Sequence, residues 1–181
     1  MTSKKTHYFK FATIVGILII VLSTRAYCSS REIDRILERN KAIVKSTPIK
    51  NMVSLEESIV SFGMKLLGTP YITAGSGKNG FDCSGFVYYV FKHFEIQVPR
   101  SSSQFKNFGK EIAIDSVRKG DILVFLSPSR NVIGHVGIVT NPKGNESDFI
   151  HASSGSEMKV IVTSLKKESY RRRFVKAVRV L

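Results

Sequence analysis

The chain has 181 residues, a formal charge of +14 at pH 7 and a pI near 10.0, and 43% of its residues are hydrophobic. This hydrophobic content excludes a disordered chain, a collagen-like protein and a low-complexity array. The length permits one globular domain with a short extension, but no second full domain. A surface this basic should attract polyanions, whose identity the composition leaves open.

The N-terminus has the pattern of an export signal. Basic residues and no acidic ones occupy the first ten positions, and the uncharged run 11–22 follows. A basic start and an apolar stretch of about 7 to 15 residues are typical of a secretory signal peptide, whereas a membrane span needs roughly 18 to 20 apolar residues. We therefore predict a signal peptide over 1–26, cleaved after Ala26, with an uncleaved anchor as the alternative. Cleavage removes four basic residues, so the formal charge falls from +14 to +10.

The first of the two cysteines, Cys28, lies directly after this signal. Cysteines at the end of export signals can carry a lipid, although Tyr27 is bulkier than the residue that usually precedes them. We predict an exported protein of the periplasm or cell envelope, with a lipoprotein as the second possibility. A membrane would be a partner only through a lipid on Cys28 or an uncleaved signal.

Residues 27–53 are predicted to form a linker or a peripheral helix. The segment is polar and mixed in charge, and Ile33, Ile36 and Leu37 recur at helical spacing. Pro48 would end any such helix.

The remaining residues, 54–181, are predicted to form one α+β domain. A Ser-x-x-Glu capping box at 54–57 predicts a helix over 55–67, and a second helix should begin close to Cys83, after the loop 74–80. Five strands are expected, at 121–126, 135–140, 149–152, 158–163 and 174–180. Because no helix separates them, they favour an antiparallel meander with the helices packed on the sheet.

The second cysteine, Cys83, lies where a glycine-rich loop enters an apolar helix. The unpaired N–H groups and positive dipole end of a helix N-terminus lower a thiol pKa and favour the nucleophilic thiolate. A small buried hydrophobic residue is the alternative interpretation of a free cysteine. An exported protein meets oxidants, however, so an unpaired thiol in a polar loop favours a functional role.

A thiol nucleophile needs a base, and the base needs a polar group to orient it. His93 is almost three helical turns from Cys83, too far to reach it, and is expected to be a surface or core residue. His135 and His151 lie on two predicted strands, and antiparallel pairing through 141–148 would bring the imidazoles together on one face. Each histidine alone could be structural, and two histidines with a cysteine could bind zinc, but no His-x-x-x-His or Cys-x-x-Cys spacing supports a metal.

Several separated segments, in order, resemble the NlpC-type family of bacterial cell-wall cysteine peptidases. They are residues 68–71, 81–87, 99–104, 119–125, 134–139 and 149–153. The resemblance runs from about Leu55 to Leu181 and implies a papain-like α+β fold, with N-terminal helices packed on a central antiparallel sheet. Ala74-Gly75 stands where the family usually has paired glycines, a small departure in the loop.

The resemblance also implies roles for individual residues. Cys83 would be the nucleophile, His135 the general base and acid, and His151 the residue that orients it. Three further residues would face the substrate, and they are Tyr71, Asp82 and Ser84. Tyr71 would line the site and could hydrogen-bond the oxyanion or the substrate.

Arg100 and Gln104 would brace the loops that frame the cleft. No cofactor and no metal are implied. The three arginines at 171–173 are interpreted separately, as the solvated beginning of the last strand.

The substrates that the resemblance implies are murein stem peptides, cut between D-Glu and the diamino acid or across the D-Ala to diaminopimelate crosslink. A surface charge of about +10 would also suit anionic wall polymers, while no motif predicts nucleic-acid binding. A catalytically silent wall-binding or scaffold module with the same fold is the alternative from another class. Amide hydrolysis or acyl transfer on another substrate is a third. The intact trio of Cys83, His135 and His151 favours the enzyme.

Overall fold

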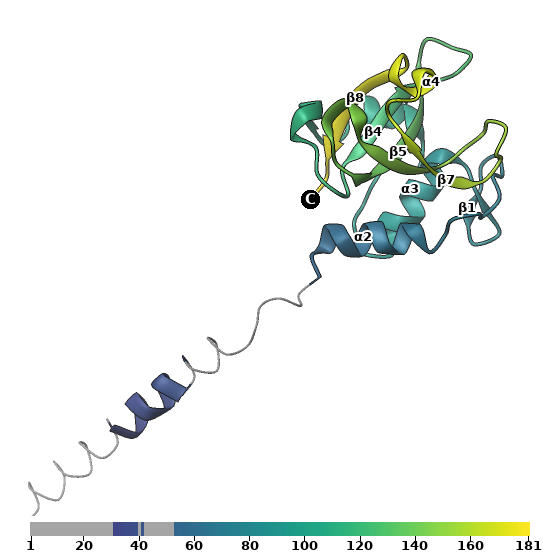
Figure 1. The fold of residues 1–181 in the computed structure, drawn as a ribbon. Helices are drawn as coiled ribbons and strands as arrows, with labels where there is room; N and C mark the ends of the chain where they lie inside the picture. Colours follow the sequence, from purple (N-terminus) through teal and green to yellow (C-terminus); the bar gives the residue numbers. More distant parts are fainter. Residues whose placement is uncertain (1–30, 40, 42–52) are drawn as a thin grey trace, which may run out of the picture. The chain divides into compact units, whose positions relative to one another are not determined.

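The computed structural model describes residues 31–39, 41 and 53–181 (Figure 1). The predicted signal peptide, Cys28 and the segment 42–52 lie outside these residues. Residues 31–39 are helical, and the three apolar side chains noted at helical spacing are each more than half exposed. Among the described residues, no helix is both long and apolar enough to cross a membrane.

Helix α2 (Leu55–Met64) begins at the predicted capping residue, because the Ser54 side chain accepts a hydrogen bond from the Glu57 N–H at 3.2 Å. Its apolar side buries Ile59 and Val60. The helix ends three residues earlier than expected, and turns lead to Gly68, whose φ of +82° suits glycine.

Helix α3 (Cys83–Lys92) begins where the sequence predicted. The side chain of Asp82 accepts a hydrogen bond from the Gly85 N–H at 2.6 Å, and most of the helix is buried. The preceding segment, predicted to be loop only, contains a hairpin of two short strands, β1 (Ser76–Gly77) and β2 (Gly80–Phe81). Strands of two residues carry no periodicity from which a sequence could predict them.

The six-stranded sheet is antiparallel throughout and has the order β3-β8-β4-β5-β6-β7. Its strands are β3 (Lys110–Ile112), β4 (Ile122–Leu126), β5 (Ile133–Asn141), β6 (Asp148–Ala152), β7 (Val160–Ser164) and β8 (Phe174–Arg179). All five predicted strands are confirmed. The meander holds only from β4 to β7, because β8 returns to the far side of β4. Strand β3 is a short, charged edge strand that the sequence analysis missed.

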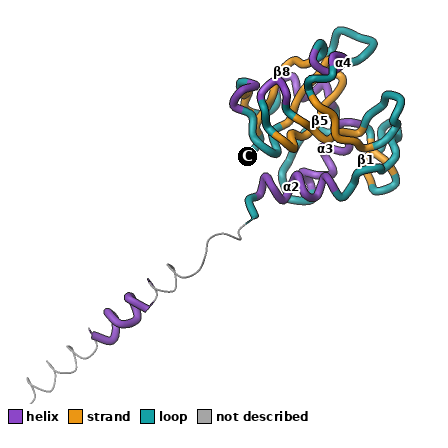
Figure 2. Tube along the Cα trace, in the orientation of Figure 1, coloured by secondary structure: helices purple, strands orange, loops and turns teal. Residues whose placement is uncertain are grey.

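Side chains of alternate parity build two cores on the two faces of the sheet. On one face Ile122 and Ile138 pack with Phe86 and Phe91 of α3. The other face buries Phe125, Phe149 and Tyr170 among others, and Tyr170 comes from the short helix α4 (Glu168–Arg171). Helices α2 and α3 lie beside the sheet, which makes the α+β layering that the sequence predicted (Figures 1 and 2).

Three 3₁₀ segments complete the domain: η2 (Ser102–Asn107), η3 (Ile114–Ser116) and η4 (Gly144–Glu146). Segment η4 lies in the connection between β5 and β6. These two strands pair antiparallel, as the sequence analysis required for the two histidines to meet.

Candidate active site

Cys83 is the first residue of α3 and its side chain faces β5. The Sγ atom lies 3.7 Å from the carbonyl oxygen of Gly134, and the residue is only 8% exposed. Burial, followed by the negative charge of Asp82, raises the pKa of the Cys83 thiol. The expectation of a lowered pKa at the helix N-terminus is therefore not met, because desolvation outweighs the backbone N–H groups that favour the thiolate. Such a thiol is protonated at rest and needs a base.

The two predicted strand histidines lie side by side. His135 on β5 and His151 on β6 are both buried, and Nε2 of His135 is 3.0 Å from Nδ1 of His151. Gly137 makes this approach possible, because a Cβ there would lie 3.1 Å from the Cβ of His151 and closer still to the ring of Phe149. The second nitrogen of His135, Nδ1, takes no part in this hydrogen bond.

A buried threonine extends the histidine pair. Oγ1 of Thr163 on β7 lies 3.0 Å from Nε2 of His151. The β6–β7 register pairs His151 with Ile161, so Thr163 is the diagonal neighbour of His151 on the same face. The sequence analysis placed a strand here but gave Thr163 no role, because the register between two strands is not readable from either strand alone.

Burial also controls the charge of the two imidazoles. It lowers the pKa of His135 well below 6.5, and the neighbouring His151 and the cationic Arg173 add to the effect. Burial lowers the pKa of His151 to about 3, with smaller contributions from Arg173 and Lys167. Both histidines are therefore neutral at neutral pH, and His135 keeps a lone pair that can accept a proton.

Tyr170 packs against both histidines, with ring centroids 5.9 Å from His135 and 5.2 Å from His151. The guanidinium of Arg173 in turn lies 4.9 Å from the centroid of the Tyr170 ring. Burial raises the pKa of the Tyr170 hydroxyl, so it stays protonated at neutral pH. Neither residue was singled out by the sequence analysis, which interpreted 171–173 as a solvated strand start.

That interpretation is wrong in part. Arg171 ends α4, and Arg173 is half-buried, with Nη1 donating to the carbonyl of Leu126 at 2.8 Å and Nε to that of Ser169 at 2.7 Å. Only Arg171 and Arg172 are exposed.

The expected substrate-facing residues gather on the other side of Cys83. Arg100 holds the Asp82 carboxylate with both terminal nitrogens, at 3.0 and 2.9 Å, and Ser84 Oγ lies 3.2 Å from the same carboxylate. Arg100 also donates to the carbonyl of Ala74 at 2.7 Å, so it braces the loop as the resemblance implied. Tyr71 is half-buried, and burial followed by the charge of Cys83 raises its pKa, which places it near the thiol.

Two other predicted residues take structural positions. Gln104 Oε1 accepts a weak hydrogen bond from the Ser101 N–H at 3.4 Å and so caps η2. His93 is exposed and stacks on Phe62 with centroids 3.9 Å apart, in agreement with the prediction that it is a surface or core residue. Within the described residues, no group of three or more His, Cys, Asp or Glu side chains is arranged to hold a metal ion.

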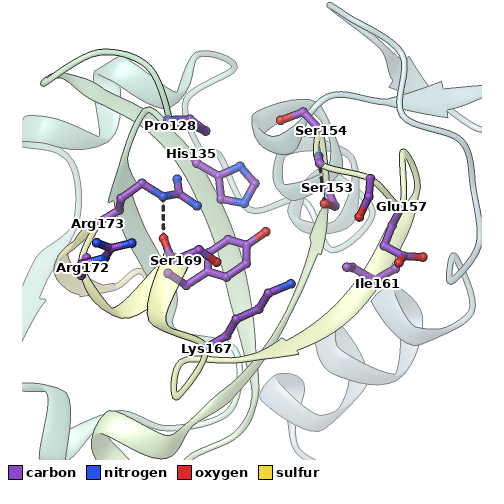
Figure 3. A pocket seen from close by; sticks show the side chains of 13 residues that line it. Pro128, His135, Ser153, Ser154, Glu157, Ile161, Lys167, Ser169, Arg172 and Arg173 are labelled. Carbon is purple, nitrogen blue, oxygen red and sulfur yellow. Dashed lines mark hydrogen bonds between the residues drawn. The ribbon is translucent and has the colours of Figure 1, made fainter.

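A pocket of about 570 Å³ opens beside His135 (Figure 3). Lys167 and Arg173 border it together with the histidine, and the Ser153 and Ser154 hydroxyl groups lie across from Arg173. His135 lines this pocket, whereas His151 is not in the lining and is fully buried.

The layered α+β fold, with a buried cysteine at a helix start and histidines on the facing sheet, defines the papain-like class of thiol hydrolases. Residues 68–179 match the model of the NlpC/P60 family, and the chain belongs to this family. Among solved structures, an NlpC/P60 family protein from Bacillus cereus is 28% identical, with a TM-score of 0.63 over 71% of this chain and 41% of the other. The NlpC/p60 domain of the peptidoglycan hydrolase SagA is also 28% identical, with a TM-score of 0.57 over 70% of this chain and 99% of that domain.

Two curated relatives have names that state an activity. The gamma-D-glutamyl-L-lysine dipeptidyl-peptidase of Bacillus subtilis is 29% identical over 76% of this chain and 40% of its own length. The murein DD-endopeptidase MepS/murein LD-carboxypeptidase of Escherichia coli K12 is 37% identical over 63% of this chain and 57% of its own length. The chain thus spans about half the length of the curated relatives it matches.

Proposed function

We propose that the protein is an exported cysteine peptidase that hydrolyses amide bonds in peptidoglycan stem peptides. The observation that carries the proposal is the 3.0 Å contact between Nε2 of His135 and Nδ1 of His151, next to a protonated thiol at the start of α3. Relatives named for gamma-D-glutamyl-L-lysine and murein peptide cleavage support the substrate class.

The proposed reaction begins with both partners neutral. Nδ1 of His135 takes the proton of Cys83 as the sulfur attacks the amide carbonyl, and His151 stabilises the resulting imidazolium by accepting its Nε2–H. The C–N bond then breaks as His135 gives the proton to the leaving amine. Water, deprotonated by His135, hydrolyses the thioester and regenerates the thiol.

The negative charge of the tetrahedral intermediate needs hydrogen-bond donors that are already in position. The backbone N–H groups of Cys83, Ser84 and Val136 point towards the sulfur, and at least part of this set can serve the oxyanion. Tyr71 keeps its proton, because burial raises its pKa, and it is the side-chain donor we assign to the oxyanion or the substrate.

A silent wall-binding or scaffold module remains the alternative. Two buried imidazoles that share a hydrogen bond, beside a buried thiol, are costly in desolvation and serve no binding surface, so they favour the enzyme. Export, to the periplasm or cell envelope, is part of the proposal and rests on the predicted signal peptide.

The test compares the purified protein with its Cys83→Ala variant on murein and on defined muropeptides. Chromatography with mass spectrometry follows the products, so that a cut between D-Glu and the diamino acid is distinguished from a cut in the crosslink. We expect Cys83→Ala to lose at least 10³-fold in kcat. Cys28→Ala, which removes the other thiol, is the matched control and should keep full activity. Equal product release by Cys83→Ala would exclude the proposed nucleophile.

A further inference from the structure

The pocket beside His135 contains two cationic groups that no carboxylate among the described residues neutralises. Within residues 53–181, no Asp or Glu oxygen lies within 4.0 Å of the Lys167 ammonium or the Arg173 guanidinium. Both groups border the cavity (Figure 3). Their charges act on His151 strongly enough to contribute to its lowered pKa, so they lie close to the site.

The other charges at the pocket are already engaged. Glu157 lies on its far wall and is 3.5 Å from Lys159, outside the pocket lining. Arg172 is 3.4 Å from Glu168, whose other oxygen holds Arg171. The positive potential beside His135 is therefore a property of Lys167 and Arg173.

The shape of the cavity fits a residue of a peptide better than a small ion. Its volume of about 570 Å³ is in the usual range for ligand sites. Hydroxyl groups of Ser153, Ser154 and Ser156 line one wall, and Ile161 adds an apolar surface. Arg173 is held in place by two backbone carbonyls and by the Tyr170 ring, which prepares its guanidinium for a carboxylate.

We propose that this pocket is a substrate subsite that binds a carboxylate-bearing residue next to the scissile amide, with Lys167 and Arg173 as its charge partners. This subsite rests on the proposed function, and the group that it selects in the substrate is the carboxylate. Lys167 is exposed, so it contributes electrostatic attraction for the carboxylate, whereas Arg173, held by two backbone carbonyls, fixes the position of the carboxylate.

The test uses two peptides that differ only at one group, a free carboxylate or its carboxamide next to the cleaved bond. Lys167→Gln should raise KM for the carboxylate peptide about three- to tenfold, with the loss in KM rather than in kcat, and should change KM little for the carboxamide. Lys166→Gln, one residue away and paired with Glu146, is the matched control and should change neither.

Arg173→Lys keeps the charge but removes the planar guanidinium that can bind a carboxylate through two nitrogens. It should also raise KM for the carboxylate peptide alone. Equal KM values for both peptides in the native protein, or equal effects of Lys167→Gln on both, would overturn the subsite. Cleavage of neither peptide by the native protein would instead overturn the proposed function.

A second, independent observation concerns the hydrogen-bond chain behind His135. For Nδ1 of His135 to accept the proton of Cys83, the single proton of neutral His135 must be on Nε2. This Nε2–H then donates the 3.0 Å hydrogen bond to His151, so Nδ1 of His151 must be the acceptor. A neutral His151 then carries its proton on Nε2. That proton points to Thr163 Oγ1, also 3.0 Å away.

The opposite arrangement would stop the reaction. If Thr163 donated to Nε2 of His151, then Nδ1–H of His151 would donate to His135 and leave the only proton of His135 on Nδ1. That nitrogen could then not accept the proton of Cys83. We infer that Thr163 is a positioning residue that acts through His151, because its oxygen accepts the Nε2–H and so fixes the productive tautomer.

Thr163→Val keeps the shape and removes the hydroxyl, and it should lower kcat about tenfold with little change in KM. Thr163→Ser should restore most of the rate, while Ser164→Ala, on the next residue, should have no effect. Imidazole ¹⁵N NMR should show His151 protonated on Nε2 in the native protein and a mixture in Thr163→Val. Native kcat in Thr163→Val, or a proton on Nδ1 of His151 in the native protein, would overturn the inference.

Discussion

The two sides of the Cys83–His135 centre use charge in opposite ways. On the α3 side, Asp82 and Arg100 form a two-point ion pair, and Arg100 also holds the loop at Ala74. On the α4 side, Lys167 and Arg173 have no carboxylate partner within the described residues. On the α3 side the two charges neutralise each other, whereas the α4 side keeps a net positive charge that is available to a ligand.

We infer from this difference that the two walls of the candidate site divide stability and ligand binding between them. Paired, partly buried charges order the segment that carries the nucleophile. Unpaired charges at a cavity add little to stability and are available for binding. If this division is correct, substitutions on the α3 side should affect the free energy of unfolding, and those on the α4 side should affect KM.

The largest effect is expected from a glycine on the α3 side. A Cβ on Gly85 would overlap the carbonyl oxygen of Gly75, so Gly85→Ala must push the loop away from the helix start. We expect a loss of about 3 kcal/mol or more in the free energy of unfolding, measured by urea denaturation. A Cβ on Gly155, on the α4 side, would contact only Ser153 Oγ, at 3.4 Å. Gly155→Ala should therefore change the free energy of unfolding by less than about 1 kcal/mol. Similar losses in both would contradict the division.

The second effect is a dependence of stability on pH that arises from the buried histidines. Folding lowers the pKa of His151 from 6.5 to about 3. Between these two pH values, His151 is protonated in the unfolded chain but neutral in the folded protein. The contribution of His151 to the free energy of unfolding should therefore be constant above pH 6.5. It should fall as the pH drops towards 3, and the loss at pH 5 should be on the order of 2 kcal/mol. Urea denaturation at pH 7 and pH 5 measures the loss.

His151→Gln is the control for this pH effect, because it removes the titrating group. Its unfolding free energy should fall less steeply between pH 7 and pH 5 than that of the native protein. A slope equal to the native one would assign the pH dependence to other groups.

A smaller effect is expected when the ion pair on the α3 side is broken. Arg100→Gln leaves the partly buried Asp82 without its cationic partner, and we expect a loss of about 1–2 kcal/mol in the free energy of unfolding. A double-mutant cycle with Asp82→Asn should give a coupling energy clearly above zero, and additive losses would show that the pair is only a surface contact.

The smallest effect belongs to the α4 side. Lys167→Gln removes a charge that has no carboxylate partner in the part of the chain that the structure describes, so the free energy of unfolding should change by less than about 0.5 kcal/mol. Thermal and urea denaturation of this variant beside Lys166→Gln should give matching curves. A clear destabilisation by Lys167→Gln alone would mean that Lys167 has a structural role.

Much of the domain could be predicted from the sequence, because local patterns determine it. The capping box at Ser54 and the position of Asp82 before an apolar run predicted the starts of α2 and α3. Short apolar, β-branched runs between turn signals predicted five of the six strands of the sheet. The misses share a cause. Strand β3 and the strands of the β1–β2 hairpin are too short to show a hydrophobic periodicity. The position of β8 beside β4 depends on which edge of the sheet is still unpaired when β8 joins it.

The candidate site divides in the same way. Cys83, His135 and His151 were predictable, because their neighbours form motifs along the chain. Thr163, Tyr170 and the pocket formed with Lys167 were not, because each reaches the site through strand register or through the packing of α4 on the sheet. Such contacts join residues that share no local pattern.

The sequence by itself thus determined most of the elements, the family and the three central residues of the candidate site, since hydrophobic pattern, capping and sequence motifs are properties of the chain itself. Only the tertiary structure decided the charge state of the site. Burial raises the pKa of the Cys83 thiol and lowers those of both histidines, against the expectation from the helix N-terminus. Desolvation depends on every neighbour that excludes water, and those neighbours come together only when the sheet and helices pack.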